Sequence, residues 1–169
     1  LFKFKLPCIL LVCFLLPAIF ILNANKVLDP DSFYHIRHAW LLRTNGLFNI
    51  SFPWTQYSVL NAWGGNNLWY GFQFLLMPFT FFADLIKGIR AAGFFIVLSA
   101  LLVMYAAFKR LGVKFAFFWP LFYIFSIPSV QFRAAMVRPH ALSGALMVLH
   151  LTFLASGSAW PVFVLSYLI

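Results

Sequence analysis

Long apolar runs constrain this chain more than any other feature of its sequence. Of its 169 residues, 64% are hydrophobic and only 9% are charged, whereas a soluble domain is nearer to half apolar and a quarter charged. A helix that spans a bilayer needs about 20 predominantly apolar residues, and several runs approach that length. They cover residues 6–22, 68–86, 91–108, 115–127 and 145–154, and the stretch from Trp160 onward. The sequence therefore predicts an integral, multi-pass membrane protein, an all-α polytopic transmembrane helix bundle.

The basic residues predict how this bundle is oriented. Lys3 and Lys5 precede the first run, so by the positive-inside rule the chain begins in the cytoplasm. The polar loop at about 23–68 then lies outside the cytoplasm, in the periplasm, the cell exterior or an organelle lumen. The formal charge of +9 is scattered between apolar runs rather than massed on one face. We therefore interpret it as a topology signal and expect no nucleic-acid partner.

An amphipathic helix is expected inside the external loop. Asp31 or Ser32 can cap its start, and Asn45-Gly46 stops it after about Thr44. Helical spacing places Phe33, Ile36, Trp40 and Arg43 toward one side, and His35, His38 and Leu42 on another. Such a helix is expected to lie along the membrane interface.

The number of crossings leaves one question open. If the runs at 68–86, 91–108 and 115–127 all cross, the polar segment from Arg133 to His140 faces the cytoplasm, opposite the external loop. If one run fails to cross, the two polar segments share a face. The run at 115–127 is short and contains proline, so it is the candidate for a broken span. Against this, the basic link at 109–114 would then lie outside.

Two of the three acidic residues, Asp29 and Asp31, lie together at the start of the external helix. Helix capping explains one of them, because Asp favours N-cap positions and Pro30 suits a first helical turn. A pair of carboxylates can also hold Mg²⁺ or Mn²⁺, which in turn binds the phosphates of a nucleotide- or lipid-linked donor. The spacing alone favours neither interpretation.

Other candidate residues are basic. His35 and His38 share a helix face; they are either interfacial polar residues or zinc ligands, and no third ligand lies at an obvious spacing. Arg37 can contact phosphate or a lipid headgroup, or it is a plain solvated charge. A second set, Arg133, Arg138 and His140, lies in or beside an apolar bundle, where ionisable groups are costly and are functional candidates. An arginine fork suits phosphate oxygens, although a cytoplasmic topogenic pair is the alternative for Arg133 and Arg138.

The segment "DSFYHIR", with Arg37 six residues after Asp31, resembles the first external motif of the GT-C superfamily of polytopic glycosyltransferases. The likeness is greatest to the catalytic subunit of oligosaccharyltransferase. The resemblance implies that Asp31 is the metal-binding, acceptor-facing acid, with Asp29 as a second carboxylate. It also implies that both external motifs lie on one face.

A second part of the resemblance is "KRLGVKFAFFWPLFYIFSIPSVQFRAAMVRPHALSG". It has the order of parts of the second GT-C motif: a basic link, a small apolar run, a proline and an arginine. Arg133 matches that arginine, while the residue seven positions further is His140, where the family has a metal-ligating Asp. The metal would then be held by Asp31, Asp29 and His140.

The expected activity is therefore transfer of a sugar or oligosaccharide from a polyprenyl-(di)phosphate donor to an extracytoplasmic protein, lipid or glycan acceptor. A divalent cation (Mg or Mn) is expected, with Arg133, Arg138 and Arg37 contacting donor phosphate. The whole stretch 1–169 is interpreted as the N-terminal part of a GT-C-like transmembrane domain whose C-terminal remainder is missing. The alternative is a non-enzymatic polytopic membrane protein, either a transporter or a subunit of a membrane complex.

Overall fold

The computed structural model describes residues 14–15, 19, 29–47, 69–126 and 128–166. All regular secondary structure among these residues is helical, which confirms the predicted all-α class. The first expected span, at 6–22, lies largely outside the described residues, as do the parts 23–28 and 48–68 of the expected external loop.

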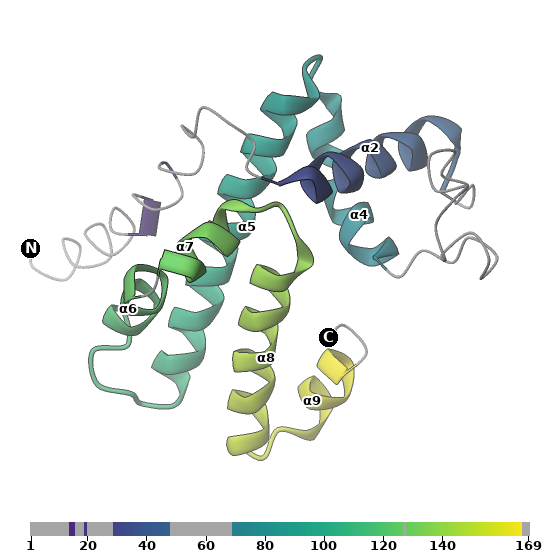
Figure 1. Cartoon of the computed structure of the whole chain (residues 1–169). Coiled ribbons are helices and arrows are strands. Elements are labelled where there is room, and N and C mark those ends of the chain that lie inside the picture. The colour runs from purple at the N-terminus through teal and green to yellow at the C-terminus, as the bar shows by residue number, and fades with distance from the viewer. Residues whose placement is uncertain (1–13, 16–18, 20–28, 48–68, 127, 167–169) are drawn as a thin grey trace, which may run out of the picture.

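The helices follow one another with short links (Figure 1). In chain order they are α2 (Pro30–Asn45), α4 (Tyr70–Leu76), the 3₁₀ helix η2 (Met77–Phe81), α5 (Leu85–Arg110), α6 (Phe118–Ser126), α7 (Pro128–Ala135), α8 (Pro139–Ala155) and α9 (Ala159–Ser166).

The long helix α5 is the centre of the fold. Asp84 caps its start, because the Asp84 carboxylate accepts a hydrogen bond from the Ile86 amide at 2.9 Å. Lys109 and Arg110 lie in its last turn, where positive charge complements the helix dipole. Its 26 residues correspond to about 39 Å of helix. Within the described part of the chain, α5 alone is long and apolar enough to cross a membrane, and α8 is apolar but shorter.

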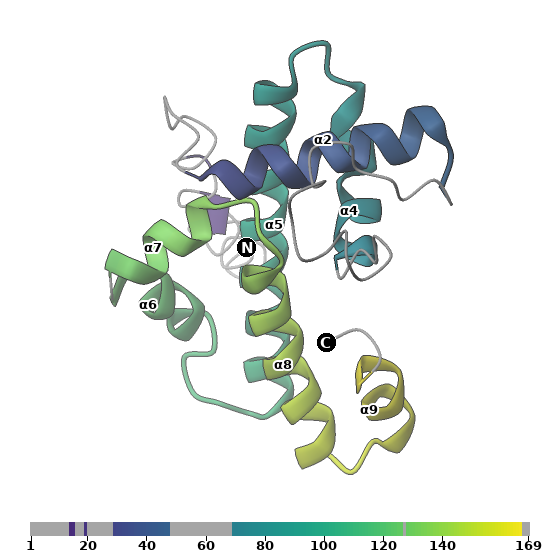
Figure 2. The ribbon, with the colours of Figure 1, turned by 45° about the vertical axis from the view of Figure 1, so that its right-hand side comes forward.

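The first third of α5 is covered by α2, α4 and η2 (Figures 1 and 2). The apolar run at 68–86 does not form one helix: it breaks into α4 and η2, because Pro78 lacks an amide donor and constrains the backbone. Helix α2 crosses α5, and the two share a buried cluster that includes Ile36, Ala92 and Ile96. This arrangement fixes the start of α2 beside the middle of α5.

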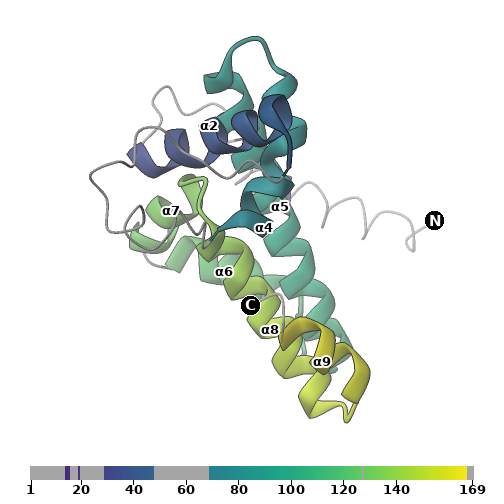
Figure 3. The same ribbon diagram turned by 90° about the vertical axis from the view of Figure 1, so that its right-hand side faces the viewer.

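The rest of α5 is covered by the second half of the chain. Helix α6 has nine residues, about 14 Å of helix, so the run at 115–127 does not form a continuous spanning helix, as expected for a broken span. Helices α6 and α7 lead back along α5, and α8 then runs beside the second half of α5 in the same direction (Figure 1). In Figure 3, α2 lies near one end of the α5–α8 pair and α9 lies at the other.

This path brings the link between α7 and α8 to the start of α2. Val137, in the link, is buried in the same cluster as Ile36 and Ile96. The two polar segments that the sequence left on uncertain sides, Asp29–Asp31 and Arg133–His140, therefore meet at one place in the fold.

Candidate functional site

The candidate site lies at the starts of two helices, each of which begins with a charged residue followed by proline. Asp29 precedes Pro30 at the start of α2, and Arg138 precedes Pro139 at the start of α8. A residue before proline is disfavoured from helical geometry, and both residues are extended, with φ/ψ of −142°/123° for Asp29 and −127°/156° for Arg138. Each side chain is therefore held at the end of its helix.

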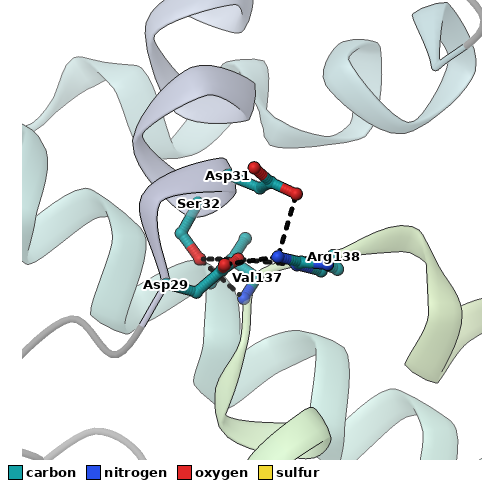
Figure 4. Close-up of polar contacts among 5 residues, drawn as sticks. All are labelled: Asp29, Asp31, Ser32, Val137 and Arg138. Atoms are coloured by element: carbon teal, nitrogen blue, oxygen red, sulfur yellow. Dashed lines mark hydrogen bonds and ion pairs between the residues drawn. The ribbon is translucent and has the colours of Figure 1, made fainter.

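Arg138 joins the two helix starts through a bidentate ion pair (Figure 4). Its Nε donates to Asp29 Oδ2 at 2.7 Å and its Nη2 donates to Asp29 Oδ1 at 2.5 Å, across 109 residues of sequence. Such a paired arrangement is the strongest form of charge-assisted hydrogen bond between side chains. The same Nη2 lies 2.9 Å from Asp31 Oδ2, so one guanidinium contacts both acids.

Burial distinguishes the two acids. The Asp29 side chain is 2% exposed and that of Asp31 is 56% exposed, while Arg138 is 29% exposed. The hydrogen bonds from Arg138 hold the pKa of Asp29 below its usual value, against the opposing effect of burial. The same pair raises the pKa of Arg138. Asp29 is thus the anchoring acid, and Asp31 presents a carboxylate to the surroundings.

Helix dipoles make this position of Arg138 unfavourable without its partners. A cation at the start of α8 faces the positive end of the helix dipole, whereas Asp29 and Asp31 lie at the start of α2, where negative charge is favoured. The two acids therefore compensate for the arginine.

Ser32 forms a second link between the same segments (Figure 4). Its Oγ accepts a hydrogen bond from the Val137 amide at 3.0 Å and donates to Asp29 Oδ2 at 3.4 Å. Ser32 and Val137 are each 1% exposed. This bond satisfies a backbone donor that no helix uses and that burial would otherwise leave costly.

Arg133 and His140 lie around a pocket that Arg138 also lines. A pocket of about 300 Å³ is lined by Ser129, Phe132, Arg133, Met136, Arg138 and His140. A second pocket, of about 240 Å³, lies between α5, α6 and the start of α8 and also reaches Arg133 and His140. Its lining is mainly apolar and includes Val97, Leu101, Met104 and Ile124. A basic pocket and an apolar one therefore share two side chains.

His35 and His38 do not lie at an aqueous surface. They are 4% and 1% exposed, and His35 packs edge-on against Trp69 and Phe72, with ring centroids 5.7 and 5.2 Å away. Tyr34 lies 5.2 Å from the His35 ring and 5.7 Å from the His38 ring. Burial lowers the pKa of His35 to about 4 and also lowers the pKa of His38. Both are neutral imidazoles in a packed aromatic cluster.

The predicted faces of α2 need correction for the same reason. Phe33 and Ile36 were expected to share a side, but Phe33 is 44% exposed and Ile36 is 1% exposed. The buried side of α2 is formed by Ser32, His35, Ile36, His38, Ala39, Leu41 and Leu42. Trp69 and Phe72 pack against His35, whereas hydropathy alone assigns histidine to the polar side.

Arg37 is not part of the ion-pair cluster. Its guanidinium lies 4.0 Å from the centroid of the Trp40 ring, on α2 itself. The structure thus brings together Asp29, Asp31 and Arg138. Arg133 and His140 line the adjoining pockets. The other predicted residues, Arg37, His35 and His38, lie further along α2.

The expected metal ligands are arranged differently from the prediction. Both oxygens of Asp29 and one oxygen of Asp31 contact the Arg138 guanidinium, while His140 lines the neighbouring pockets. Among the described residues, no three His, Cys, Asp or Glu side chains are grouped so as to hold a metal ion. Asp29, Asp31 and His140 therefore do not form a ligand set in this arrangement, and the divalent cation stays a prediction.

Two features of the site were missed from the sequence. Arg138 was one phosphate-binding candidate among three, yet it is the partner of both acids, and Ser32 was considered only as a helix cap. A signal for the first was present: Asp29-Pro30 and Arg138-Pro139 are two X-Pro helix starts of opposite charge.

The chain was also compared with known proteins. No protein-family model, no curated protein and no solved structure matches it. The function must therefore be inferred from the geometry described above and from the short motifs that resemble GT-C enzymes.

Proposed function

We propose that this protein is a membrane glycosyltransferase of the GT-C type. In this proposal a sugar or oligosaccharide moves from a polyprenyl-phosphate or polyprenyl-diphosphate donor to an extracytoplasmic acceptor, and the chain crosses the membrane several times. The observation that carries the proposal is the contact of 2.9 Å between Asp31 and Arg138. It places an accessible acid from the first motif beside a cation from the second.

The two pockets support the donor class. A lipid-linked sugar phosphate has an apolar chain and an anionic head, so its site needs an apolar surface that adjoins basic groups. The apolar pocket along Val97, Leu101 and Met104 and the basic pocket share Arg133 and His140. The proposed donor has its phosphate near Arg133 and Arg138, where guanidinium donors neutralise oxygen charge, and part of its isoprenoid chain in the apolar pocket.

The proposed reaction is a displacement at the anomeric carbon of the sugar. The acceptor nucleophile forms a bond to that carbon while the bond from carbon to phosphate oxygen breaks, and the Asp31 carboxylate orients the nucleophile and accepts its proton. The lipid phosphate leaves with the electron pair. Charge grows on its oxygens during this step, and fixed positive groups nearby lower the barrier. Arg133 and Arg138 have that role in the proposal.

The test is glycan transfer by the purified chain reconstituted in liposomes with a radiolabelled polyprenyl-phosphate or polyprenyl-diphosphate sugar. Release of the lipid phosphate and appearance of labelled product measure turnover even with an unidentified acceptor, if a membrane extract supplies it. Asp31→Asn keeps the shape of the side chain and removes the base, so turnover should fall at least about 100-fold. Transfer by Asp31→Asn at the wild-type rate, with normal insertion, would overturn the mechanism.

A non-enzymatic role is the second candidate, and the Asp29–Arg138 pair is compatible with it. That pair fastens α2 to the start of α8 and would do so equally in a transporter or in a subunit of a membrane complex. Substitution of Asp31 distinguishes the two functions. A purely structural contact between α2 and α8 needs only the buried Asp29, whereas the proposed enzyme needs the exposed Asp31.

A further inference from the structure

Arg138 lies between the two acids in the position of a bridging cation. Three carboxylate oxygens contact its guanidinium: Oδ1 and Oδ2 of Asp29 through two donors, and Oδ2 of Asp31 through Nη2. A divalent ion held between the two acids would take at least one oxygen from each as a ligand. In the described arrangement both oxygens of Asp29 already pair with the arginine, so such an ion would compete with Arg138 for Asp29.

The positive charge of Arg138 also opposes binding of a divalent ion at the two acids. Two ionised aspartates contribute two negative charges and Arg138 returns one positive charge. A divalent ion that joined the cluster would lie within a few ångströms of a guanidinium that cannot be deprotonated, and the two cations would repel each other. A divalent ion held by both acids would therefore displace Arg138 from Asp29, which would leave a buried carboxylate without its partner.

We propose that Arg138 is the built-in cation of this site and takes the place of a divalent metal. Asp29 anchors it, Asp31 is held in place by it, and neither acid binds Mg²⁺ or Mn²⁺. The role of Arg138 in sugar transfer rests on the proposed function, but the exclusion of metal from the two acids does not.

One side of the Arg138 guanidinium stays available to bind an anion. The bonds to Asp29 and Asp31 use Nε and Nη2. Within the described part of the chain, Nη1 makes no hydrogen bond, and Arg138 lines the basic pocket with Arg133 and His140. Arg138 can therefore keep its fork on Asp29 and still offer donors to an anion in that pocket, as a phosphate-bound metal would offer open coordination positions.

The test is a direct measurement of metal binding by the purified full chain in detergent, with Mn²⁺ as the probe and electron paramagnetic resonance as the readout of free Mn²⁺. Wild type is expected to bind no stoichiometric Mn²⁺. Arg138→Gln should bind Mn²⁺ at least about tenfold more tightly than wild type, because a unit positive charge next to the carboxylates is removed. Arg133→Gln makes the same charge change in the same segment without touching either acid, and should bind Mn²⁺ no more tightly than wild type.

One result would overturn the proposal outright: wild type binds one Mn²⁺ per chain and Asp31→Asn loses it. A second variant guards against misfolding of Arg138→Gln. Arg138→Lys keeps the positive charge, so it should exclude Mn²⁺ as wild type does, and binding equal to that of Arg138→Gln would contradict the exclusion by charge. Because binding is read without any turnover, a chain that neither transfers sugar nor binds Mn²⁺ would refute the proposed function and leave this inference standing.

Discussion

Asp29 and Arg138 form a bidentate ion pair between two helix starts that are 109 residues apart in sequence. The acid is 2% exposed and the arginine 29%. Asp31, two positions after Asp29, contacts the same guanidinium but is 56% exposed. The two acids therefore have separable roles: Asp29 stabilises the contact between α2 and α8, and Asp31 is the acid whose side chain is accessible.

Asp29→Asn should lower the free energy of unfolding by about 3 kcal/mol, because it leaves the fork of Arg138 without its buried anion. Asp31→Asn should lower it by less than about 1 kcal/mol, since an exposed partner contributes little. Titration with SDS in mixed micelles, followed by tryptophan fluorescence, measures both values. Equal losses in the two variants would contradict the separation of roles.

Ser32→Ala should destabilise the same contact by about 2 kcal/mol, because the buried Val137 amide loses its acceptor. The matched control is Ser126→Ala. Ser126 is exposed and donates only to the Tyr123 carbonyl within α6, so its loss should change the free energy of unfolding by less than about 0.5 kcal/mol. A Ser32→Ala variant as stable as this control would show that the link to Val137 contributes nothing.

The helical class and the end of α2 were predictable from the sequence because they depend on local chemistry. Helix α2 was expected to end before Gly46 and does so, and the short run at 115–127, the candidate for a broken span, forms only the nine-residue α6. Both features follow from residues whose backbone preferences act within a few positions.

The site was predictable only in part, because its pairing is decided by tertiary contacts. Asp29, Asp31 and Arg138 were all candidates, but hydropathy cannot tell which acid will be buried beside which arginine. The choice of Asp31 over Asp29 followed a motif, whereas the burial of Asp29 follows from the packing of α2 on α5 and on the α7–α8 link. His35 was misplaced because it packs against Trp69 and Phe72, which lie more than 30 residues further along the chain.

The buried histidines predict a pH dependence of stability. The pKa of His35 is about 4 in the folded protein, against an ordinary value of 6.5. Below pH 6.5, His35 therefore takes up a proton in the unfolded chain, whereas in the folded chain it stays neutral until the pH approaches 4. The free energy of unfolding should fall between pH 6.5 and pH 4 by about 3 kcal/mol from this group, and His38 acts in the same direction.

His35→Phe tests this assignment, because phenylalanine keeps a ring against Trp69 and Phe72 and cannot be protonated. Denaturation profiles at pH 4 to 7 should be flatter in the variant, with the remaining slope due to His38. Asp29 does not confuse the comparison: its pKa is lowered, so the stability it provides is lost only as the pH falls below about 4. A variant profile parallel to that of wild type would remove His35 as the cause.

Two helical glycines predict opposite effects of the same substitution. A Cβ at Gly88, in α5, would lie 2.3 Å from the Phe79 carbonyl oxygen, while a Cβ at Gly144, in α8, would meet nothing within 4 Å. Gly88→Ala should therefore force η2 away from α5 and lower the free energy of unfolding by about 2 kcal/mol. Gly144→Ala should raise it by about 0.5–1 kcal/mol, because alanine loses less backbone entropy in a helix. The same SDS titration measures both, and a Gly88→Ala variant as stable as Gly144→Ala would mean that η2 does not pack closely on α5.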